Sequence, residues 1–93
     1  MQVNHVKGKK AAEIMLYTLS TCIWCKKTKA LLKELGVEYF YIDVDTVPEE
    51  DKVKVSEEIE KWNEAVSFPT IVFNNKEAVL GYNPEEIKEK LKL

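Results

Sequence analysis

The sequence predicts an α/β fold in which a mixed four-stranded core sheet is flanked by helices, in the order β-α-β-α-β-β-α, with an extra strand at the N-terminus. Two observations support this prediction. Apolar, strand-like stretches alternate with amphipathic helical patterns over the first two thirds of the chain. Two short strand-like stretches then follow each other across a turn and precede a last helix. Strands joined through a helix lie parallel and strands joined by a tight turn lie antiparallel, so the sheet should be mixed.

The N-terminal segment is expected to form a hairpin. Gln2–Val6 alternates weakly between polar and apolar residues, and Lys7-Gly8-Lys9 can turn the chain back. The partner would be the apolar stretch Ile14–Leu19, which is the first strand of the core. His5 in this segment is expected to be a solvated strand histidine.

The first helix is expected over residues 22–35, where leucines recur on one face. Gly36 follows at the position where helices commonly end in a left-handed residue. The stretch 38–45 is rich in aromatic and β-branched residues. It predicts a second core strand, parallel to the first.

A second helix is expected to begin at Pro48, because acidic residues fill the turn that follows this proline. Val55, Ile59, Trp62 and Val66 then recur at helical spacing and form one apolar stripe. All four side chains are therefore expected in the core.

Residues 67–73 and 77–80 are expected to form the last two strands, antiparallel across an Asn-Asn-Lys turn. Asn83 then offers a helix N-cap, with Pro84 at the first helical position and Glu86 at the third. The last helix should therefore begin just after Asn83.

Length and composition limit the possible functions. A chain of 93 residues is expected to form a single domain spanning residues 1–93. A net charge of −2 indicates no excess of basic residues that would bind nucleic acid or an acidic membrane surface. The longest apolar runs are about six residues, against the ~20 that span a bilayer, and residues 1–12 lack the apolar core of a secretory signal. We therefore expect a cytoplasmic monomer that binds neither nucleic acid nor membranes.

The chain's two cysteines form a C-x-x-C motif, Cys22-Ile23-Trp24-Cys25, between the first strand and the first helix. This context indicates a redox dithiol rather than half of a zinc site. A thiolate attacks a disulfide, and the free N–H groups and dipole at a helix N-terminus favour the anion. Cys22 is therefore the predicted nucleophile. Cys25, three residues on over the same helical face, is placed to resolve the mixed disulfide.

Three segments resemble those of glutaredoxins, a branch of the thioredoxin superfamily. They are Tyr17-Thr18-Leu19-Ser20-Thr21-Cys22-Ile23-Trp24-Cys25-Lys26-Lys27, Ser67-Phe68-Pro69-Thr70 and Gly81-Tyr82-Asn83-Pro84. The order of elements extends the resemblance over nearly the whole chain. The resemblance implies a thioredoxin fold, and the third segment is similar to the Gly-aromatic-x-Pro element of redoxins that serve ribonucleotide reductase.

The resemblance also implies a substrate-binding surface. The second segment takes the place of the family's cis-proline loop, where the residue before the proline, here Phe68, offers backbone groups to the substrate's cysteine. Packing of Phe68 in the core is the alternative. Tyr17 is expected at the rim of the site, beside the dithiol. The remaining expected substrate-binding residues are Thr21, Trp24, Pro69, Gly81 and Tyr82.

Two positions differ from glutathione-using glutaredoxins. Those proteins carry a lysine three residues before the first cysteine, where this chain has Leu19, and an aspartate in the stretch that matches Gly81-Tyr82-Asn83. A charge-assisted contact is worth roughly 1.5–3 kcal/mol, so we expect weak recognition of glutathione. Lys26 and Lys27 are an alternative source of positive charge.

The predicted function is that of a dithiol–disulfide oxidoreductase acting on protein disulfides or on mixed disulfides of low-molecular-weight thiols. No resident cofactor is expected. An external thiol reductant or a flavin reductase would reduce the Cys22–Cys25 disulfide back to the dithiol. One alternative is a dedicated electron donor to one enzyme such as ribonucleotide reductase. Another is a metal or iron–sulfur module completed by a bridged dimer, because such a site needs about four ligands and His5 is the only other soft one.

Overall fold

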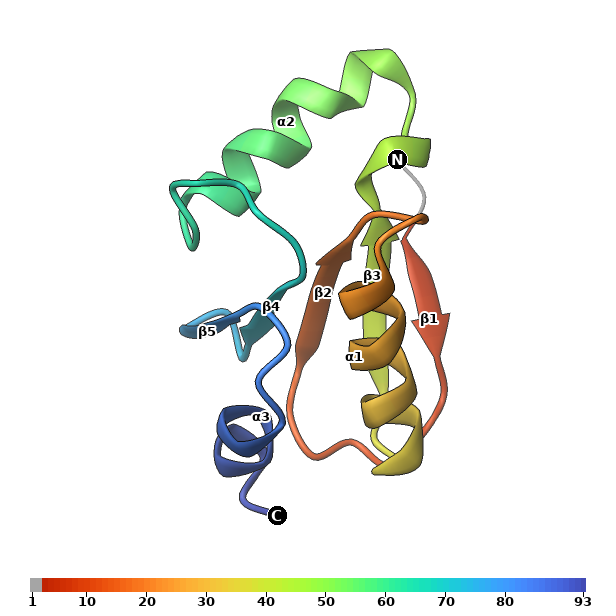
Figure 1. Cartoon of the computed structure of the whole chain (residues 1–93), viewed down its shortest axis with the longest axis vertical. Coiled ribbons are helices and arrows are strands. Elements are labelled where there is room, and N and C mark those ends of the chain that lie inside the picture. The colour runs from red at the N-terminus through yellow and green to blue at the C-terminus, as the bar shows by residue number, and fades with distance from the viewer. Residues whose placement is uncertain (1–2) are drawn as a thin grey trace.

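The computed structural model describes residues 3–93, and within this range it contains five strands and three α-helices (Figure 1). In chain order they are β1 (Asn4–Val6), β2 (Ile14–Thr18), α1 (Ile23–Glu34), β3 (Tyr39–Asp43), α2 (Glu49–Glu60), β4 (Thr70–Phe73), β5 (Glu77–Leu80) and α3 (Pro84–Leu91). A short 3-10 helix, Val44–Thr46, joins β3 to α2. The predicted order of elements is confirmed, including the extra strand at the N-terminus. None of these helices has the length and apolar character needed to cross a membrane.

The strands form one mixed sheet in the order β1-β3-β2-β4-β5. The central strand β2 lies parallel to β3, with Leu16 opposite Tyr41, and antiparallel to β4, with Leu16 opposite Ile71. β5 returns antiparallel on β4. Since α1 connects the two parallel strands, the predicted strand–helix–strand unit is confirmed, and the four-stranded core has the thioredoxin fold.

The predicted N-terminal hairpin is wrong. β1 pairs antiparallel with β3 and not with β2, and Gln2, which the prediction included, lies outside the described residues. β2 already has β3 on one side and β4 on the other, whereas β3 has an edge that β1 can occupy. The connection from β1 therefore passes the end of α1. There the Lys9 N–H donates to the Gly36 carbonyl at 2.8 Å, and the Glu38 N–H donates to the Lys9 carbonyl at 2.9 Å.

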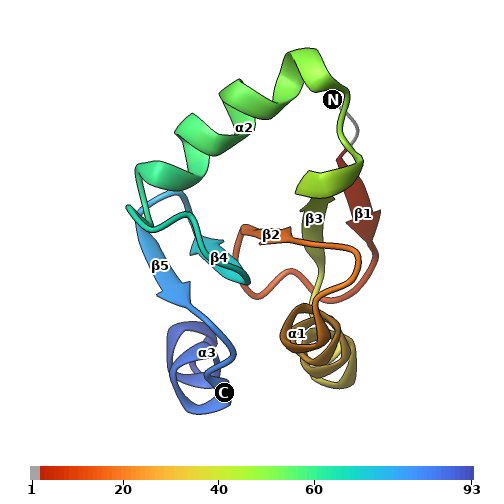
Figure 2. The same ribbon diagram turned by 45° about the horizontal axis from the view of Figure 1, so that its top comes forward.

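Two cores lie on opposite faces of the sheet (Figure 2). α1 and α3 lie on one face and α2 crosses the other. Successive side chains of a strand point to opposite faces, so Ile14 and Leu16 of β2 pack with α1 and α3, while Met15 and Tyr17 pack with α2. β2 thus holds all three helices to one sheet.

The apolar stripe predicts the buried face of α2 correctly and the end of the helix incorrectly. Val55 and Ile59 are buried as expected. The helix stops at Glu60, so Trp62 and Val66 lie in the loop that follows. Both are half-buried and still pack against the core under α2.

The start of α3 and the end of α1 are as predicted. The Asn83 side chain accepts the Glu86 N–H at 3.2 Å, and Pro84 is the first residue of α3. Gly36 follows α1 with φ of +70°, a conformation that glycine adopts without a steric penalty.

Gly8 lies where the β1–β2 connection comes closest to the chain after α1. A Cβ at Gly8 would lie 2.6 Å from the carbonyl carbon of Val37 and 2.8 Å from the backbone nitrogen of Glu38. Backbone atoms held by the Lys9 hydrogen bonds cannot move aside easily. We expect Gly8→Ala to lower the free energy of unfolding by about 1–3 kcal/mol, measured by urea denaturation. Lys7→Ala is the control and should change it by less than about 0.5 kcal/mol; equal stability of the two variants would contradict the close approach.

Candidate active site

Cys22 is the N-cap residue of α1. Its backbone is extended, with φ −82° and ψ 118°, and its Sγ accepts the Cys25 N–H at 3.3 Å. Cys22 is partly exposed, and the first turn of the helix contains no acidic residue. The unpaired N–H groups and the positive end of the helix dipole therefore face an accessible sulfur, which is a setting that favours negative charge.

Cys25 is fully buried in the first turn of α1. Burial raises the pKa of its thiol to about 12, and its hydrogen bond with the Cys22 side chain acts in the same direction. The Leu19 backbone and the Lys29 ammonium act in the opposite direction. Both cysteines are free thiols. The two sulfurs are thus chemically unequal, since one is accessible at a helix N-terminus and the other holds its proton.

The loop before Cys22 is attached to the turn after β3. The Ser20 N–H donates to Asp45 Oδ1 at 2.8 Å, and the Ser20 hydroxyl donates to the other carboxylate oxygen. The hydrogen bond from the Ser20 hydroxyl, followed by that from its N–H, lowers the pKa of Asp45. The Cys22 N–H also donates to the Leu19 carbonyl at 3.1 Å. Asp45, which sequence reasoning did not identify, therefore helps to position the first cysteine.

A partly buried ion pair lies one helical turn beyond Cys25. Lys29 Nζ is 3.0 Å from Asp43 Oδ1, and the two side chains are 22% and 19% exposed. The buried Thr18 hydroxyl donates to the same carboxylate oxygen at 2.6 Å, and Lys29 Nζ also lies 4.0 Å from the centroid of the Tyr41 ring. These contacts tie α1 to the end of β3 and hold a cation on the side of α1 that carries the buried thiol.

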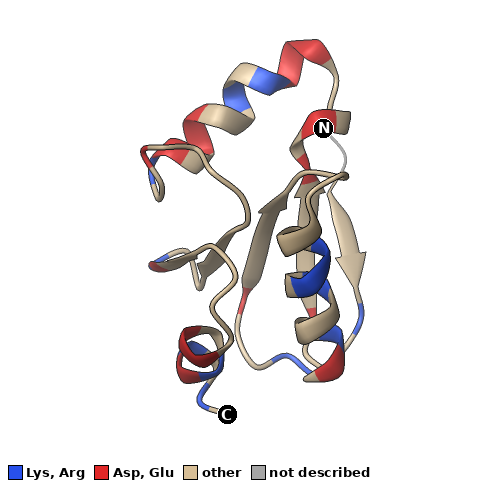
Figure 3. Ribbon diagram, viewed as in Figure 1, with Lys and Arg blue, Asp and Glu red and all other residues tan. Residues whose placement is uncertain are grey.

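Charge is distributed unevenly around the molecule. Lysines gather along α1 and carboxylates along α2 (Figure 3). Lys26 and Lys27 directly follow the C-x-x-C motif. The dithiol therefore lies at the start of the lysine-bearing helix.

A groove of about 260 Å³ opens beside the C-x-x-C motif. It is lined by Trp24, Phe68, Pro69, Gly81 and Tyr82. The Trp24 and Tyr82 rings stack with centroids 5.8 Å apart, and Lys27 Nζ lies 4.5 Å from the Trp24 ring centroid. The Gly81 N–H donates to the Pro69 carbonyl at 2.9 Å and so joins two of the three segments. The structure thus brings together five of the seven predicted substrate-binding residues.

The Phe68–Pro69 peptide bond is cis, as the resemblance implied. Phe68 is half-buried, lines the groove and also packs against the core under α2. Packing of Phe68 against the core is therefore confirmed, and the contact of its backbone groups with a substrate stays a prediction.

Asn63 holds this loop in place, and sequence reasoning missed it. The residue is 5% exposed, and its amide donates to the Ser67 carbonyl at 3.2 Å and to Thr70 Oγ1 at 3.0 Å. The sequence contained a signal, because Asn63 continues the spacing of Val55 and Ile59 and is thus a polar residue at a core position.

Tyr17 and Thr21 do not join the groove. Tyr17 is buried under α2 and lines a different cavity and not the groove. The alternation of β2 explains this, since Leu16 and not Tyr17 faces the α1 side. Thr21 is exposed in the turn just before Cys22.

His5 lies on the edge strand β1. In the sheet, β3 separates β1 from β2, the strand that precedes the two cysteines. His5 Nε2 is 2.9 Å from Glu38 Oε2, and its ring stacks on Phe40 with centroids 4.5 Å apart. Within residues 3–93, no group of three or more His, Cys, Asp or Glu side chains is arranged to hold a metal ion. A cluster shared between two copies stays a hypothesis.

Comparison with known proteins identifies the family. The glutaredoxin family profile matches residues 14–78, which include both cysteines and the Phe68–Pro69 loop. The chain belongs to the glutaredoxin family. The glutaredoxin of Methanosarcina mazei Go1 is 41% identical, with a TM-score of 0.92 over 100% of this chain and 90% of that one. The methanoredoxin of Methanosarcina acetivorans is 42% identical, with a TM-score of 0.89 over 92% and 90% of the two chains.

Two further relatives are more distant. A glutaredoxin-like protein from the rubredoxin operon of Clostridium pasteurianum is 32% identical over 74 residues, covering 80% of this chain and 91% of the relative. A buckwheat glutaredoxin in complex with glutathione is 18% identical with a TM-score of 0.66, which shows a shared fold alone. Membership of the family is consistent with thiol–disulfide redox chemistry at the two cysteines.

Lys29 should affect the titration of the buried thiol in this glutaredoxin. Its charge favours the Cys25 thiolate, so we expect Lys29→Met to raise the pKa of Cys25 further. The thiolate absorbance of the reduced protein, followed against pH, should show the upper titration step moving to higher pH. Lys33→Met removes the same charge one turn further along α1 and should leave that step in place.

Asp43 would lack its cation in the Lys29→Met variant, so the double variant Lys29→Met/Asp43→Asn provides a second control. It should keep the raised pKa of Cys25. An unchanged upper step in both variants would show that Lys29 does not act on this thiol.

Proposed function

We propose that the chain is a dithiol–disulfide oxidoreductase in which Cys22 attacks and Cys25 resolves. The observation that supports this proposal is the inequality of the two sulfurs. Cys22 is accessible at the N-cap of α1, and Cys25 is buried directly behind it with its N–H on the Cys22 sulfur. The first can reach an external disulfide, and the second can reach only the first.

The reaction has two exchange steps. The Cys22 thiolate attacks one substrate sulfur, the substrate S–S bond breaks, and a mixed disulfide forms as the first substrate thiolate leaves. Cys25 then gives up its proton and attacks the Cys22 sulfur. The Cys22–Cys25 disulfide forms, and the second substrate sulfur leaves as a thiolate and takes up a proton. Two electrons pass to the substrate, and an external thiol or a flavin reductase restores the dithiol.

The order of these steps follows from the environment of Cys25. Its pKa is raised partly by the hydrogen bond with Cys22 and by the Cys22 charge. Both contributions end when Cys22 enters a mixed disulfide, while the Lys29 charge continues to favour the Cys25 thiolate. Cys25 therefore becomes easier to deprotonate at the stage where its thiolate is needed.

The substrate groove favours a largely apolar partner. Three of its five lining residues are aromatic, and the Lys27 ammonium lies over one of them, Trp24. A protein disulfide with apolar neighbours fits these walls, as does a small thiol with an acidic group near Lys27.

Substitution of each cysteine tests the roles. Cys22→Ser should reduce turnover of a protein disulfide by about 100-fold or more, because the nucleophile is lost. Cys25→Ser should still react once, and a mixed disulfide on Cys22 should accumulate and be detectable by mass spectrometry under non-reducing conditions. Accumulation on Cys25 in the Cys22→Ser variant at a comparable rate would reverse the assignment.

Glutathione should be a poor reductant for this chain. Leu19 stands where a lysine would pair with a carboxylate, and the Asn83 side chain is engaged in capping α3. We expect Leu19→Lys to raise glutathione-dependent turnover about tenfold, the equivalent of ~1.4 kcal/mol. Leu19→Met is the uncharged control and should not raise it.

Reduction of a small neutral disulfide separates recognition from reactivity. Its rate should be the same in the unsubstituted protein and the Leu19→Lys variant, since the substitution replaces neither cysteine. If the unsubstituted protein already uses glutathione as well as the lysine variant does, then Lys26, Lys27 or backbone groups recognise the tripeptide. A panel of glutathione, other small thiols and flavin reductases would then identify the reductant.

A further inference from the structure

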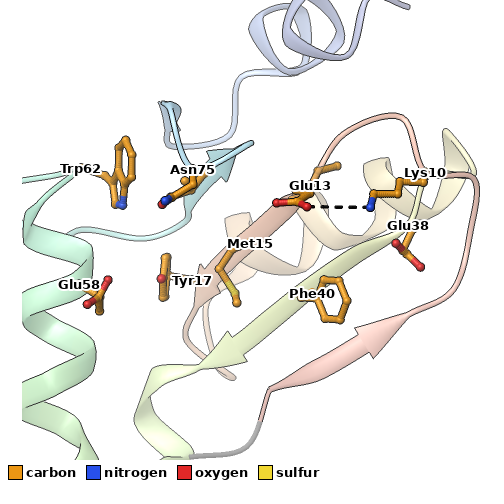
Figure 4. Close-up of a pocket in the computed structure, with 11 residues that line it drawn as sticks. Lys10, Glu13, Met15, Tyr17, Glu38, Phe40, Glu58, Trp62 and Asn75 are labelled. Atoms are coloured by element: carbon orange, nitrogen blue, oxygen red, sulfur yellow. Dashed lines mark ion pairs between the residues drawn. The ribbon is translucent and has the colours of Figure 1, made fainter.

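A second cavity lies on the α2 face of the sheet. Its volume is about 430 Å³, within the range of small-molecule sites, and none of its lining residues lines the groove at the C-x-x-C motif. Met15 and Tyr17 of β2, Phe40 of β3, and Glu58 and Trp62 from α2 and the loop after it surround it (Figure 4). The redox chemistry proposed above uses none of these residues.

The walls of this cavity combine aromatic rings with a thioether. Among the helices of residues 3–93, α2 alone covers this face, and Phe40 remains 37% exposed while Met15 and Trp62 are half-buried. Figure 4 shows the Tyr17 ring between Glu58 and Met15, with Trp62 at the same end of the cavity and Phe40 at the other. Faces of aromatic rings attract cations, and Met side chains adapt to ligands of varied shape.

Tyr17 presents an unused polar group to this cavity. The residue is 8% exposed, and its hydroxyl makes no hydrogen bond with another residue of the described chain. No buried side-chain N or O atom of the described residues lacks a hydrogen-bond partner, so this unpaired hydroxyl is accessible from the cavity that Tyr17 lines. Burial, followed by the nearby Glu58 charge, raises the pKa of Tyr17, so the phenol stays neutral and can donate or accept a hydrogen bond.

The charged residues around the cavity are mostly acidic. Lys10 and Glu13 form an ion pair of 3.9 Å at the rim, which leaves Glu38 and Glu58 among the lining residues. Glu38 contacts His5, and Glu58 pairs with Lys61 at 3.0 Å through side chains that are 53% and 64% exposed. Exposed pairs of this kind contribute little, so a ligand can replace them. The cavity is therefore complementary to positive charge.

We propose that this cavity binds a small organic cation, an amine or guanidinium carried on an apolar body. The cationic group would lie between Glu58, Trp62 and the Tyr17 hydroxyl. The apolar body would lie along Met15 and Phe40. The site is independent of the dithiol.

The test uses three ligands of one shape and different charge: 2-phenylethylamine, 2-phenylethanol and 3-phenylpropionate. Each is titrated into the reduced full-length protein, and the Trp62 indole and Met15 methyl signals are followed by NMR. We expect the amine to shift both signals and to bind at least about fivefold more tightly than the alcohol, with the acid weakest. Equal binding of the three, or no shift at Trp62 and Met15 with the amine, overturns the proposal.

Variants locate the cation. Glu58→Gln should weaken binding of the amine about fivefold or more, and Tyr17→Phe, which keeps the ring in the core, should weaken it about two- to fivefold. Glu57→Gln makes the same change at an exposed neighbour outside the cavity and should have no effect. If Glu57→Gln weakens binding as much as Glu58→Gln, the attraction is a property of the acidic helix and not of the cavity.

A Cys22→Ser variant separates this site from the redox site. It should bind the amine unchanged while disulfide exchange is lost. Loss of binding in Cys22→Ser, or amine-induced shifts confined to Trp24 in the groove, would place the ligand at the dithiol and contradict the proposal.

Discussion

The hydrogen bond from the Cys25 N–H to the Cys22 sulfur is the contact on which the candidate site depends. Helices usually begin with a Ser, Thr, Asp or Asn cap, and here a sulfur takes that place. The same turn that fixes Cys22 at the helix N-terminus directs Cys25 into the protein interior. One accessible sulfur and one buried sulfur therefore follow from a single local geometry, and their different roles need no further catalytic group.

The sheet supplies the supports for this helix start. The end of β3 and the turn after it contribute two carboxylates, Asp43 to Lys29 of α1 and Asp45 to Ser20 of the preceding loop. Asn63 fixes the Phe68–Pro69 loop from the other face. These partners are far from the cysteines in sequence, yet they contact α1, the loop before it and the loop that lines the groove. The position of the dithiol thus depends on these polar contacts as well as on the two cores.

Local patterns predicted most of this fold, and they failed where the answer depended on the whole sheet. The Asn83 cap and the Gly36 end of α1 depend on a few neighbouring residues, and both are as predicted. The partner of β1 depends on which strand has a free edge, which only the complete strand order shows. Tyr17 was misplaced because a motif position does not specify the face of β2 on which the side chain lies. Asp43 and Asp45 were missed because their partners, Lys29 and Ser20, come from distant segments, whereas Asn63 was missed although it is a polar residue at core spacing.

Limited alkylation of the reduced protein tests the central claim most directly. At about pH 6 an ordinary thiol, with a pKa of about 8.5, is almost wholly protonated, so a limiting amount of iodoacetamide reports which sulfur is accessible and anionic. Mass spectrometry of the digested protein then locates the adduct. The unequal environments of the two sulfurs predict an adduct on Cys22, with Cys25 unmodified. Labelling of Cys25 first, or equal labelling of both, would contradict the account.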